Sequence, residues 1–426
     1  MSSLRDKLLR QLRSGGVAGT ASLVWKSAKY RVRTAPRQAS RQWNVEIRLP
    51  REFERRCRNG GLETDTREVL SRTLAYVARN HQSLRGIGAY SYKPGGPPLC
   101  YASCYAALTL HLCGQLQRLV PPARKEWAAF IRNYQGDDGL FRDPLIDNPL
   151  AARIDWWGWR HLTLHALMAL AALGEVADKP FSAIAPFQRK GCISQWLEAR
   201  DWKQDPASAS NGVQNCGSFL QYARDFHGAR WCGDALAEMF RWLNAHQDPA
   251  TGLWGEQFHT PQLLSHGVQT GYHLWLLYFY DQLPIRYAQP IIDSCLCTQN
   301  KLGGFGAALN STACEDIDSI DPLVRLSLAV DYRREEVRKS LIRARRWVLF
   351  NQNADGGWVF HRRQAFEYGH QLMRSEKEES AMFPTWFRTL SLAYLDQALA
   401  TADRPALPWQ FLNCPGLRFW KPPSGQ

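Results

Sequence analysis

Gln352-Asn-Ala-Asp-Gly-Gly-Trp358 is the stretch that decides the fold, because its Gln–Gly–aromatic pattern recurs along the chain. Three further copies are Gln135-Gly-Asp-Asp-Gly-Leu-Phe141, Gln247-Asp-Pro-Ala-Thr-Gly-Leu-Trp254 and Gln299-Asn-Lys-Leu-Gly-Gly-Phe305. Their marker glycines lie at 139, 252, 304 and 357, so successive gaps are 113, 52 and 53 residues. The double-length first gap predicts a degenerate copy near 195–205, and one step back from 139 predicts another near 86–90. The chain therefore reads as six repeats.

Each turn follows an amphipathic segment and precedes a more apolar one. The amphipathic segments include 127–134, 235–245 and 341–350, and the apolar ones include 162–173, 272–280, 323–330 and 386–395. The glycine supplies the positive φ that a tight turn after a helix requires. Amphipathic helices outside and apolar helices inside predict an all-α fold, a single (α/α)6 toroid of six helical hairpins around one central pocket.

The predicted toroid covers residues 61–400, between a basic N-terminal arm (1–60) and a C-terminal tail (401–426) expected to pack on it. Of the formal net charge of +14, residues 1–41 contribute +9, from ten Lys/Arg and one acid. Leucines 4, 8, 9 and 12 lie at helical spacing among these basic residues, so the arm is either solvated or a helix on an anionic membrane surface. No secretory or membrane-spanning segment is present, which predicts a cytoplasmic protein, free or peripherally attached to a membrane.

The 11 cysteines are odd in number and lack paired spacing, which is typical of reduced thiols. We therefore expect no structural metal site and no cofactor. The basic arm lacks interleaved aromatic residues and the body contains no recognised nucleic-acid module. The expected partner is a small-molecule substrate, not a nucleic acid.

At the four plain turns the sequence resembles the QW-type repeats of the terpenoid cyclase and protein prenyltransferase superfamily. In that family a Gln caps a neighbouring helix, and an aromatic residue after the Gly stacks beneath it. The turn at 352–358 is the clearest match, and the resemblance covers about residues 86–398. It implies the toroid fold, but related toroids do unrelated work, so it implies the chemistry less firmly. The zinc-binding pattern of the prenyltransferase branch is matched in neither order nor spacing.

Polar and aromatic residues recur between each turn and its predicted inner helix, which in a toroid is the mouth of the pocket. Those expected to bind substrate are Trp156, Trp159, His161, Asn211, Asn215, Gln269, Tyr272, Trp386 and Arg388. His266 and His273 are candidates for proton transfer. The alternative is that the histidines are hydrogen-bonded core or rim residues and that the aromatic residues are core.

The run Cys314-Glu-Asp-Ile-Asp-Ser-Ile-Asp-Pro322 is the main candidate for catalysis. Carboxylates this close cannot all ionise cheaply, so one should have a raised pKa and act as a general acid. The run also resembles the D-x-D-D motif of class II terpene cyclases, which implies Asp318 as proton donor, with Ser319 in place of the final Asp. The residues implied to act with Asp318 are Asp316, Glu315, Asp321 and His273. Alternatively, the acids satisfy free amides at a helix N-terminus.

Three functions remain open from the sequence. The first is proton-initiated cyclisation, or a related proton transfer, on an isoprenoid. The second is a carbohydrate lyase, hydrolase or epimerase that uses His266, Tyr272 and Asn215 with the same acids. The third is a non-catalytic scaffold that binds a partner or lipid. The density of ionisable residues at the mouth favours an enzyme.

Overall fold

The computed structural model describes residues 43–255 and 258–416, and within them the chain is predominantly helical. The described residues contain one antiparallel strand pair, β1 (Phe366–Glu367) and β2 (Arg374–Ser375). The predicted all-α class is confirmed. The chain divides into two compact units, residues 1–54 and 55–426. The membrane-surface prediction for the N-terminal arm concerns residues outside the described part.

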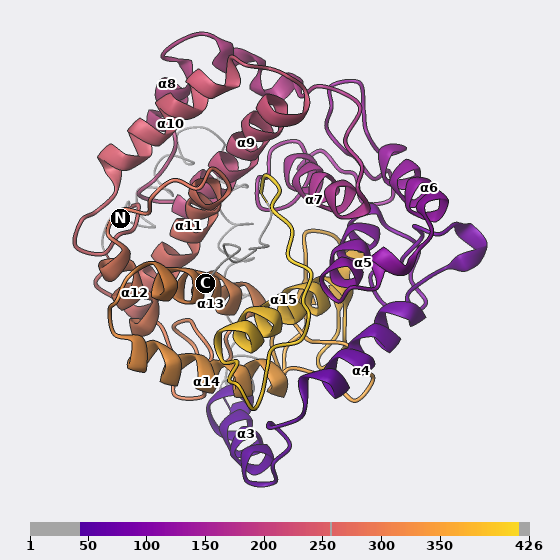
Figure 1. Cartoon of the computed structure of the whole chain (residues 1–426), viewed down its shortest axis with the longest axis vertical. Coiled ribbons are helices and arrows are strands. Elements are labelled where there is room, and N and C mark those ends of the chain that lie inside the picture. Colours follow the sequence, from indigo (N-terminus) through magenta and orange to yellow (C-terminus); the bar gives the residue numbers. More distant parts are fainter. Residues whose placement is uncertain (1–42, 256–257, 417–426) are drawn as a thin grey trace, which may run out of the picture. The chain divides into compact units, whose positions relative to one another are not determined.

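The second unit alternates two sets of α-helices, which carry even and odd numbers from α4 onward (Figure 1). The even set comprises α4 (Thr66–Arg79), α6 (Pro121–Arg132), α8 (Cys192–Glu198), α10 (Cys232–His246), α12 (Ala288–Cys297) and α14 (Arg334–Phe350). The odd set comprises α5 (Cys100–Leu112), α7 (Trp159–Leu173), α9 (Pro206–Phe226), α11 (Pro261–Tyr280), α13 (Ala313–Ala329) and α15 (Met382–Ala398). Before them lie η1 (Trp43–Arg48) and α3 (Leu49–Arg58), and between them η2 (Ser83–Arg85), η3 (Leu116–Arg118), η4 (Ser182–Gln188) and η5 (Gln371–Met373).

The odd-numbered helices form a continuous series of contacts. Helix α5 packs on α7, α7 on α9, α9 on α11, α11 on α13, α13 on α15, and α15 on α5 again (Figure 1). These helices are buried on nearly every face, whereas even-numbered helices such as α14 alternate buried and exposed positions. The even-numbered helices α6, α10, α12 and α14 each pack on an odd-numbered neighbour. The predicted alternation of amphipathic and apolar helices is therefore observed.

The glutamine of each plain turn bonds both its own turn and the next repeat. Gln299 donates through Nε2 to the carbonyl of Gly303 at 2.8 Å and to that of Ser340 on α14 at 2.9 Å. Gln352 donates in the same way to Gly356 and to Val69 of α4, each at 3.1 Å. The last turn thus reaches the first helix of the series, 283 residues away. The glutamines thus contact the neighbouring helix as expected, but the carbonyls of Ser340 and Val69 lie within that helix rather than at its end.

The start of three odd-numbered helices differs from the prediction. Helix α13 begins at Ala313 rather than near residue 323, because Thr312 and Glu315 form a capping box that ends the preceding loop. Helices α9 and α11 likewise begin early, at prolines that follow the capping side chains of Asp205 and Thr260. The polar residues expected in loops before these helices therefore lie on the helices themselves.

The odd-numbered helices run in the same direction, since their N-terminal ends contact each other. Tyr101 of α5 bonds His161 of α7 at 2.9 Å, and Ser265 of α11 bonds Glu315 of α13 at 3.4 Å. The N-terminal ends of these six helices are called the N-terminal rim below. The described part of the C-terminal tail packs at the other end, where the Gln410 amide donates to the last carbonyl of α5. None of the described helices is long and apolar enough to cross a bilayer.

Candidate functional site

Helix α13 presents the four carboxylates of the 314–322 run at the N-terminal rim, but it places them in different surroundings. Their positions along the helix point them in different directions, because successive residues are rotated by about 100°. Asp316, Asp318 and Asp321 are buried, and Glu315 is half-buried. These surroundings separate structural carboxylates from those available for chemistry.

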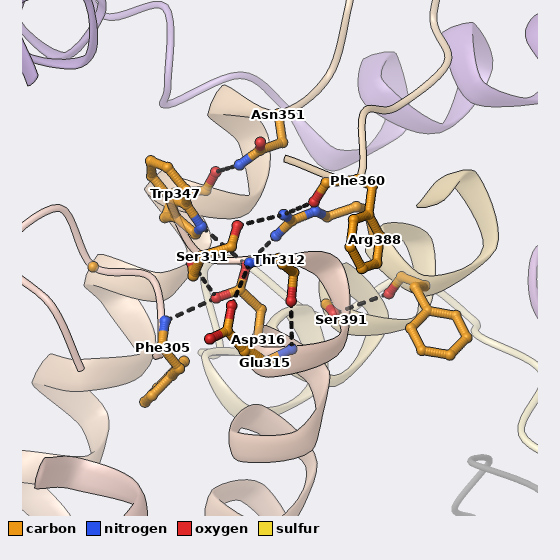
Figure 2. Close-up of polar contacts among 12 residues, drawn as sticks. Phe305, Ser311, Thr312, Glu315, Asp316, Trp347, Asn351, Phe360, Arg388 and Ser391 are labelled. Atoms are coloured by element: carbon orange, nitrogen blue, oxygen red, sulfur yellow. Dashed lines mark hydrogen bonds and ion pairs between the residues drawn. The ribbon is translucent and has the colours of Figure 1, made fainter. Parts of the chain in front are cut away.

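Asp316 is the centre of a saturated hydrogen-bond network (Figure 2). Its Oδ1 accepts from the Phe305 amide and the Ser311 hydroxyl, each at 2.8 Å. Its Oδ2 accepts from the Trp347 indole at 2.9 Å and forms an ion pair with Arg388. The two charged side chains are almost completely buried. Asp316 therefore joins a repeat turn, α14 and α15. Both of its carboxylate oxygens are fully hydrogen-bonded within the protein.

Arg388 was expected to bind substrate, but in the structure its guanidinium bonds other residues of the protein. Its NH2 donates to the carbonyl of Ser311 at 3.3 Å and to that of Phe360 at 3.0 Å. Together with the Asp316 pair, these bonds fix the loop that leads into α13 (Figure 2). A fully buried guanidinium with these partners is a structural element rather than a substrate ligand.

Asp321 is also engaged. Its Oδ2 accepts from the Tyr272 hydroxyl at 2.7 Å, and it forms an ion pair with Arg325 one turn later on α13. Arg325 in turn donates to the hydroxyl of Tyr394 on α15 at 2.9 Å. Asp321 and Tyr272, both predicted site residues, are thus brought together. Their contacts connect α11, α13 and α15 below the rim.

Glu315 is the carboxyl group with the properties of a general acid. Burial raises its pKa, and the charge of the adjacent Asp316 raises it further, against the lowering effect of the Thr312 amide. The capping box accounts for Oε2, which accepts from that amide at 2.8 Å. Its Oε1 is 3.4 Å from the Ser265 hydroxyl on α11. The sequence left two roles open for the acidic run, a general acid and a helix cap. Glu315 has the properties of both, because it caps α13 and has a raised pKa.

Asp318 lies one turn further along α13 and is only 2% exposed. Burial raises the pKa of the Cys295 thiol on α12, and the negative charge of Asp318 adds to that effect. Asp318 therefore places a charge in a buried region close to Glu315. Glu315 has a raised pKa and is more exposed than Asp318, which makes Glu315 the more accessible acid of the two.

A cluster of tyrosines and histidines forms a second part of the N-terminal rim. His161 bonds the hydroxyl of Tyr101 through Nδ1 at 2.9 Å and that of Tyr368 through Nε2 at 3.1 Å. Its ring lies 4.4 Å from that of His165. Tyr368 stacks on Phe383 of α15 at 4.3 Å. The predicted residue His161 is thus the hub of an aromatic cluster that joins α5, α7 and α15.

Sequence reasoning missed two members of this cluster, Tyr368 and His165. Tyr368 belongs to the irregular connection between α14 and α15, which has no counterpart in the repeat spacing. His165 could have been found, because it follows His161 by four residues on a helix and so shares its face.

Most of the predicted site residues on α9 and α11 form hydrogen bonds within the protein. His273 bonds the Ser210 hydroxyl through Nδ1 at 3.0 Å, which links the two helices. Asn215 donates to the backbone carbonyl of Asp155 at 2.8 Å. Asn211 and Gln269 each donate to a carbonyl four residues earlier on their own helix. His266 is exposed on α11.

The predicted tryptophans divide between core and surface. Trp386 is 1% exposed and belongs to the core. Trp159 donates to Asp147 at 2.7 Å and lies under the guanidinium of Arg142, 4.1 Å from the ring centre. Trp156 is 43% exposed, and its ring lies 5.9 Å from that of Tyr368. Trp156 is therefore the aromatic residue of the rim that remains accessible to a ligand.

A small recess borders the aromatic cluster. Its volume is about 10 Å³, and its lining includes Tyr101, Trp157 and Trp159. A space of this size holds about one water molecule, so a substrate at this part of the rim would lie outside the recess.

No protein-family model matches this chain, and no curated protein is significantly similar to it. The function is therefore argued from the site alone.

Proposed function

We propose that this protein is a toroid enzyme that protonates an isoprenoid substrate and so starts its cyclisation. The half-buried carboxyl of Glu315, with its raised pKa at the N-terminal rim, is the observation that supports this most directly. A carboxyl that stays protonated at higher pH than usual is suited to donate a proton.

The toroid itself is part of the proposal. It is supported by the unbroken series of contacts from α5 through α15 and back to α5. The bonds from Gln352 to α4 support it independently, because they join the last repeat to the first. Six helical hairpins that pack in series and rejoin at their ends leave no unpartnered terminal helix.

The proposed step transfers one proton. The O–H bond of Glu315 breaks, and the electron pair of a substrate double bond forms a new C–H bond with that proton. The substrate becomes a carbocation and Glu315 becomes a carboxylate. After ring formation, a neighbouring C–H bond loses its proton to a base and its electron pair forms the product's double bond, so charge and atoms balance.

The surroundings are suited to a cationic intermediate. Asp318 supplies a buried negative charge one turn from the donor. Aromatic rings from α5, α15 and the connection before α15 gather at the rim, where their faces attract cations. The residues of this aromatic wall are Tyr101, Tyr105, Tyr368, Phe383 and Phe387.

The tyrosines favour proton donation over the base chemistry of a carbohydrate lyase. A lyase needs a group that removes a proton next to a carboxylate, and a tyrosine does so only when its pKa is lowered. Burial instead raises the pKa of Tyr101 and Tyr105 well above the ordinary value. These hydroxyls therefore stay protonated.

A saccharide remains the second candidate because of Trp156. Its exposed ring lies at the rim, 5.9 Å from the ring of Tyr368. Sugars commonly stack on such rings, since the C–H face of a pyranose is apolar. This candidate would use Glu315 as the acid that protonates a glycosidic oxygen.

The test is incubation of the full-length protein with polyprenyl diphosphates, squalene-type hydrocarbons and their epoxides, with products identified by mass spectrometry. We expect a cyclised product from the wild type and from Glu335→Gln, an exposed glutamate of α14 that serves as the matched control. Glu315→Gln should lower the rate by about 100-fold or more, since a general acid contributes that much. Equal rates for Glu315→Gln and wild type, or cleavage of an oligosaccharide instead, would exclude the proposal.

A further inference from the structure

Helix α9 combines complete burial with a polar sequence. Every residue from Ala209 to Ala223 is buried. Seven of these positions nevertheless hold hydrogen-bonding side chains: Ser210, Asn211, Gln214, Asn215, Ser218, Gln221 and Tyr222. A helix that is buried on all faces is normally apolar on all faces. Helix α7 follows that rule more closely, with its run of leucine and alanine. Helices α13 and α15 also bury polar side chains, such as Asp316, Asp321 and Arg388, but these are hydrogen-bonded.

Four polar atoms on this helix have no hydrogen-bond partner within the described part of the chain. They are Gln214 Nε2, Asn215 Oδ1, Ser218 Oγ and Gln221 Oε1. The hydroxyl of Thr270 on α11, the helix that packs on α9, is in the same condition. Buried groups of this kind are costly unless something bonds them. Their concentration on one helix and its neighbour indicates a polar binding surface rather than scattered packing faults.

The side chains of Ser210, Gln214 and Ser218 form a stripe, because residues four apart share one face of a helix. We name these three residues the α9 stripe. At its N-terminal end Ser210 bonds His273, which lies in the second half of α11. At its other end Ser218 lies next to Gly416 of the C-terminal tail, where a Cβ would meet both Ser218 and Leu164 of α7. The stripe therefore leads from the N-terminal part of α9 toward the tail, and Gln214 lies between the two.

We infer that the α9 stripe, with Thr270, binds the oxygen-bearing part of the substrate, which makes that substrate an isoprenoid with a hydroxyl, carbonyl or epoxide oxygen rather than a hydrocarbon. This inference rests on the proposed function. Gln214 Nε2 supplies a donor, and the hydroxyls of Ser218 and Thr270 either donate or accept. An ether, epoxide or carbonyl oxygen accepts such bonds, and an alcohol does both.

The neighbouring helices favour a substrate that is polar on one part only. Helix α7, which packs on α9, buries Leu164, Leu167 and Met168, and α15 buries Phe383 and Phe387. A saccharide would present hydroxyls to these apolar surfaces as well, where they would have no partners. The unbonded polar atoms of α9 beside the apolar side chains of α7 fit a molecule with a long apolar body and one oxygenated segment.

The experiment measures equilibrium binding to full-length protein that carries Glu315→Gln, so that no turnover intervenes. Tryptophan fluorescence is titrated with a C20 isoprenoid alcohol, the hydrocarbon of the same skeleton and a neutral oligosaccharide. Gln214→Leu and Ser218→Ala are compared with Ser340→Ala. Ser340 is the matched control, because it is a buried serine on α14 whose hydroxyl also has no partner among the described residues.

We expect the alcohol to bind about tenfold more tightly than the hydrocarbon, the equivalent of one good hydrogen bond. Gln214→Leu and Ser218→Ala should reduce this preference without lowering the midpoint of thermal unfolding, whereas Ser340→Ala should keep it. Equal binding of alcohol and hydrocarbon, or a preference that survives both stripe variants, overturns the inference and leaves the proposed function standing. Binding of the oligosaccharide and of neither isoprenoid overturns both.

Discussion

The Asp316 network and the α9 stripe are both buried and both polar, but they differ in how well their atoms are bonded. Each oxygen of Asp316 accepts two hydrogen bonds or ion-pair contacts from residues of four different segments (Figure 2). On α9, Gln214 Nε2 and Ser218 Oγ have no partner in the described residues. Burial alone therefore does not separate structural from functional polar groups. Saturation excludes a group from ligand binding, because a saturated group has nothing left to offer a ligand.

The contrast also explains why two residues only two positions apart have different roles. Asp316 and Asp318 share one helix and one short motif. Asp316 faces Trp347 and Arg388, where it holds three segments together. Asp318 lies on another face of α13, at nearly the same burial, where its charge acts on Cys295. The same residue type thus serves structure in one place and electrostatics in the other.

The largest effect is expected for Asp316→Asn. This variant leaves the buried guanidinium of Arg388 without its counter-charge, which should lower the free energy of unfolding by about 3–5 kcal/mol. Urea denaturation of the two proteins measures the difference. Asp137→Asn is the control, because this exposed aspartate pairs with Lys179 on the surface and should be nearly neutral. A cost below about 1 kcal/mol for Asp316→Asn would break the comparison, since it would make the network dispensable.

A sharper form of the comparison uses two fully buried helical threonines, Thr73 and Thr270. The Thr73 hydroxyl accepts from the indole of Trp358 at 3.0 Å and from Gln352 at 3.1 Å. Thr73→Val should therefore lower the free energy of unfolding by about 2 kcal/mol, because it leaves a buried indole N–H unbonded. Thr270→Val removes an unbonded hydroxyl and should be neutral or slightly stabilising. Similar losses for both variants, measured by urea denaturation, would remove the distinction on which the α9 stripe rests.

The smallest effect concerns the pH dependence of stability at Glu315. Its pKa is raised in the folded protein, above the ordinary value of 4.5, so the folded state binds the proton more tightly than the unfolded state. This contribution to stability is complete below about pH 4.5 and is lost as the pH rises through the raised pKa.

Glu315→Gln should flatten this part of the curve of unfolding free energy against pH, while glutamine keeps the capping box. Thermal unfolding between pH 4 and pH 8 measures both curves. A wild-type curve that rises with pH where the variant is flat would give the opposite sign and reject Glu315 as the acid.

Much of the fold could be predicted from the sequence because its determinants are local. The Gln–Gly–aromatic turns gave the repeat spacing, and the glutamines do bond their own turns. The alternation of amphipathic and apolar segments gave both sets of helices. Helix starts were harder, since the polar residues after Thr312 and Thr260 resemble a loop until the capping side chains are recognised.

The candidate site was predictable only as a set of residues. Sequence spacing brought attention to the acids of α13 and to His161, which the structure places at one rim. The resemblance ranked Asp318 first among the acids, but a linear motif does not show how exposed each carboxyl group is, and the structure leaves Glu315 more exposed than Asp318. Sequence spacing also could not find Tyr368, whose place depends on an irregular connection outside the repeat.

The sequence by itself determined the repeated helical pairs and the chemical types gathered near their ends. Both follow from periodicity and from short-range turn geometry, which need no knowledge of distant residues. The tertiary structure decided which polar groups are saturated. Arg388 reaches Asp316 across 72 residues, and Gln352 reaches Val69 across 283. Such pairings depend on how the helices pack, and so does the raised pKa of Glu315, because burial and a neighbouring charge are properties of the folded chain.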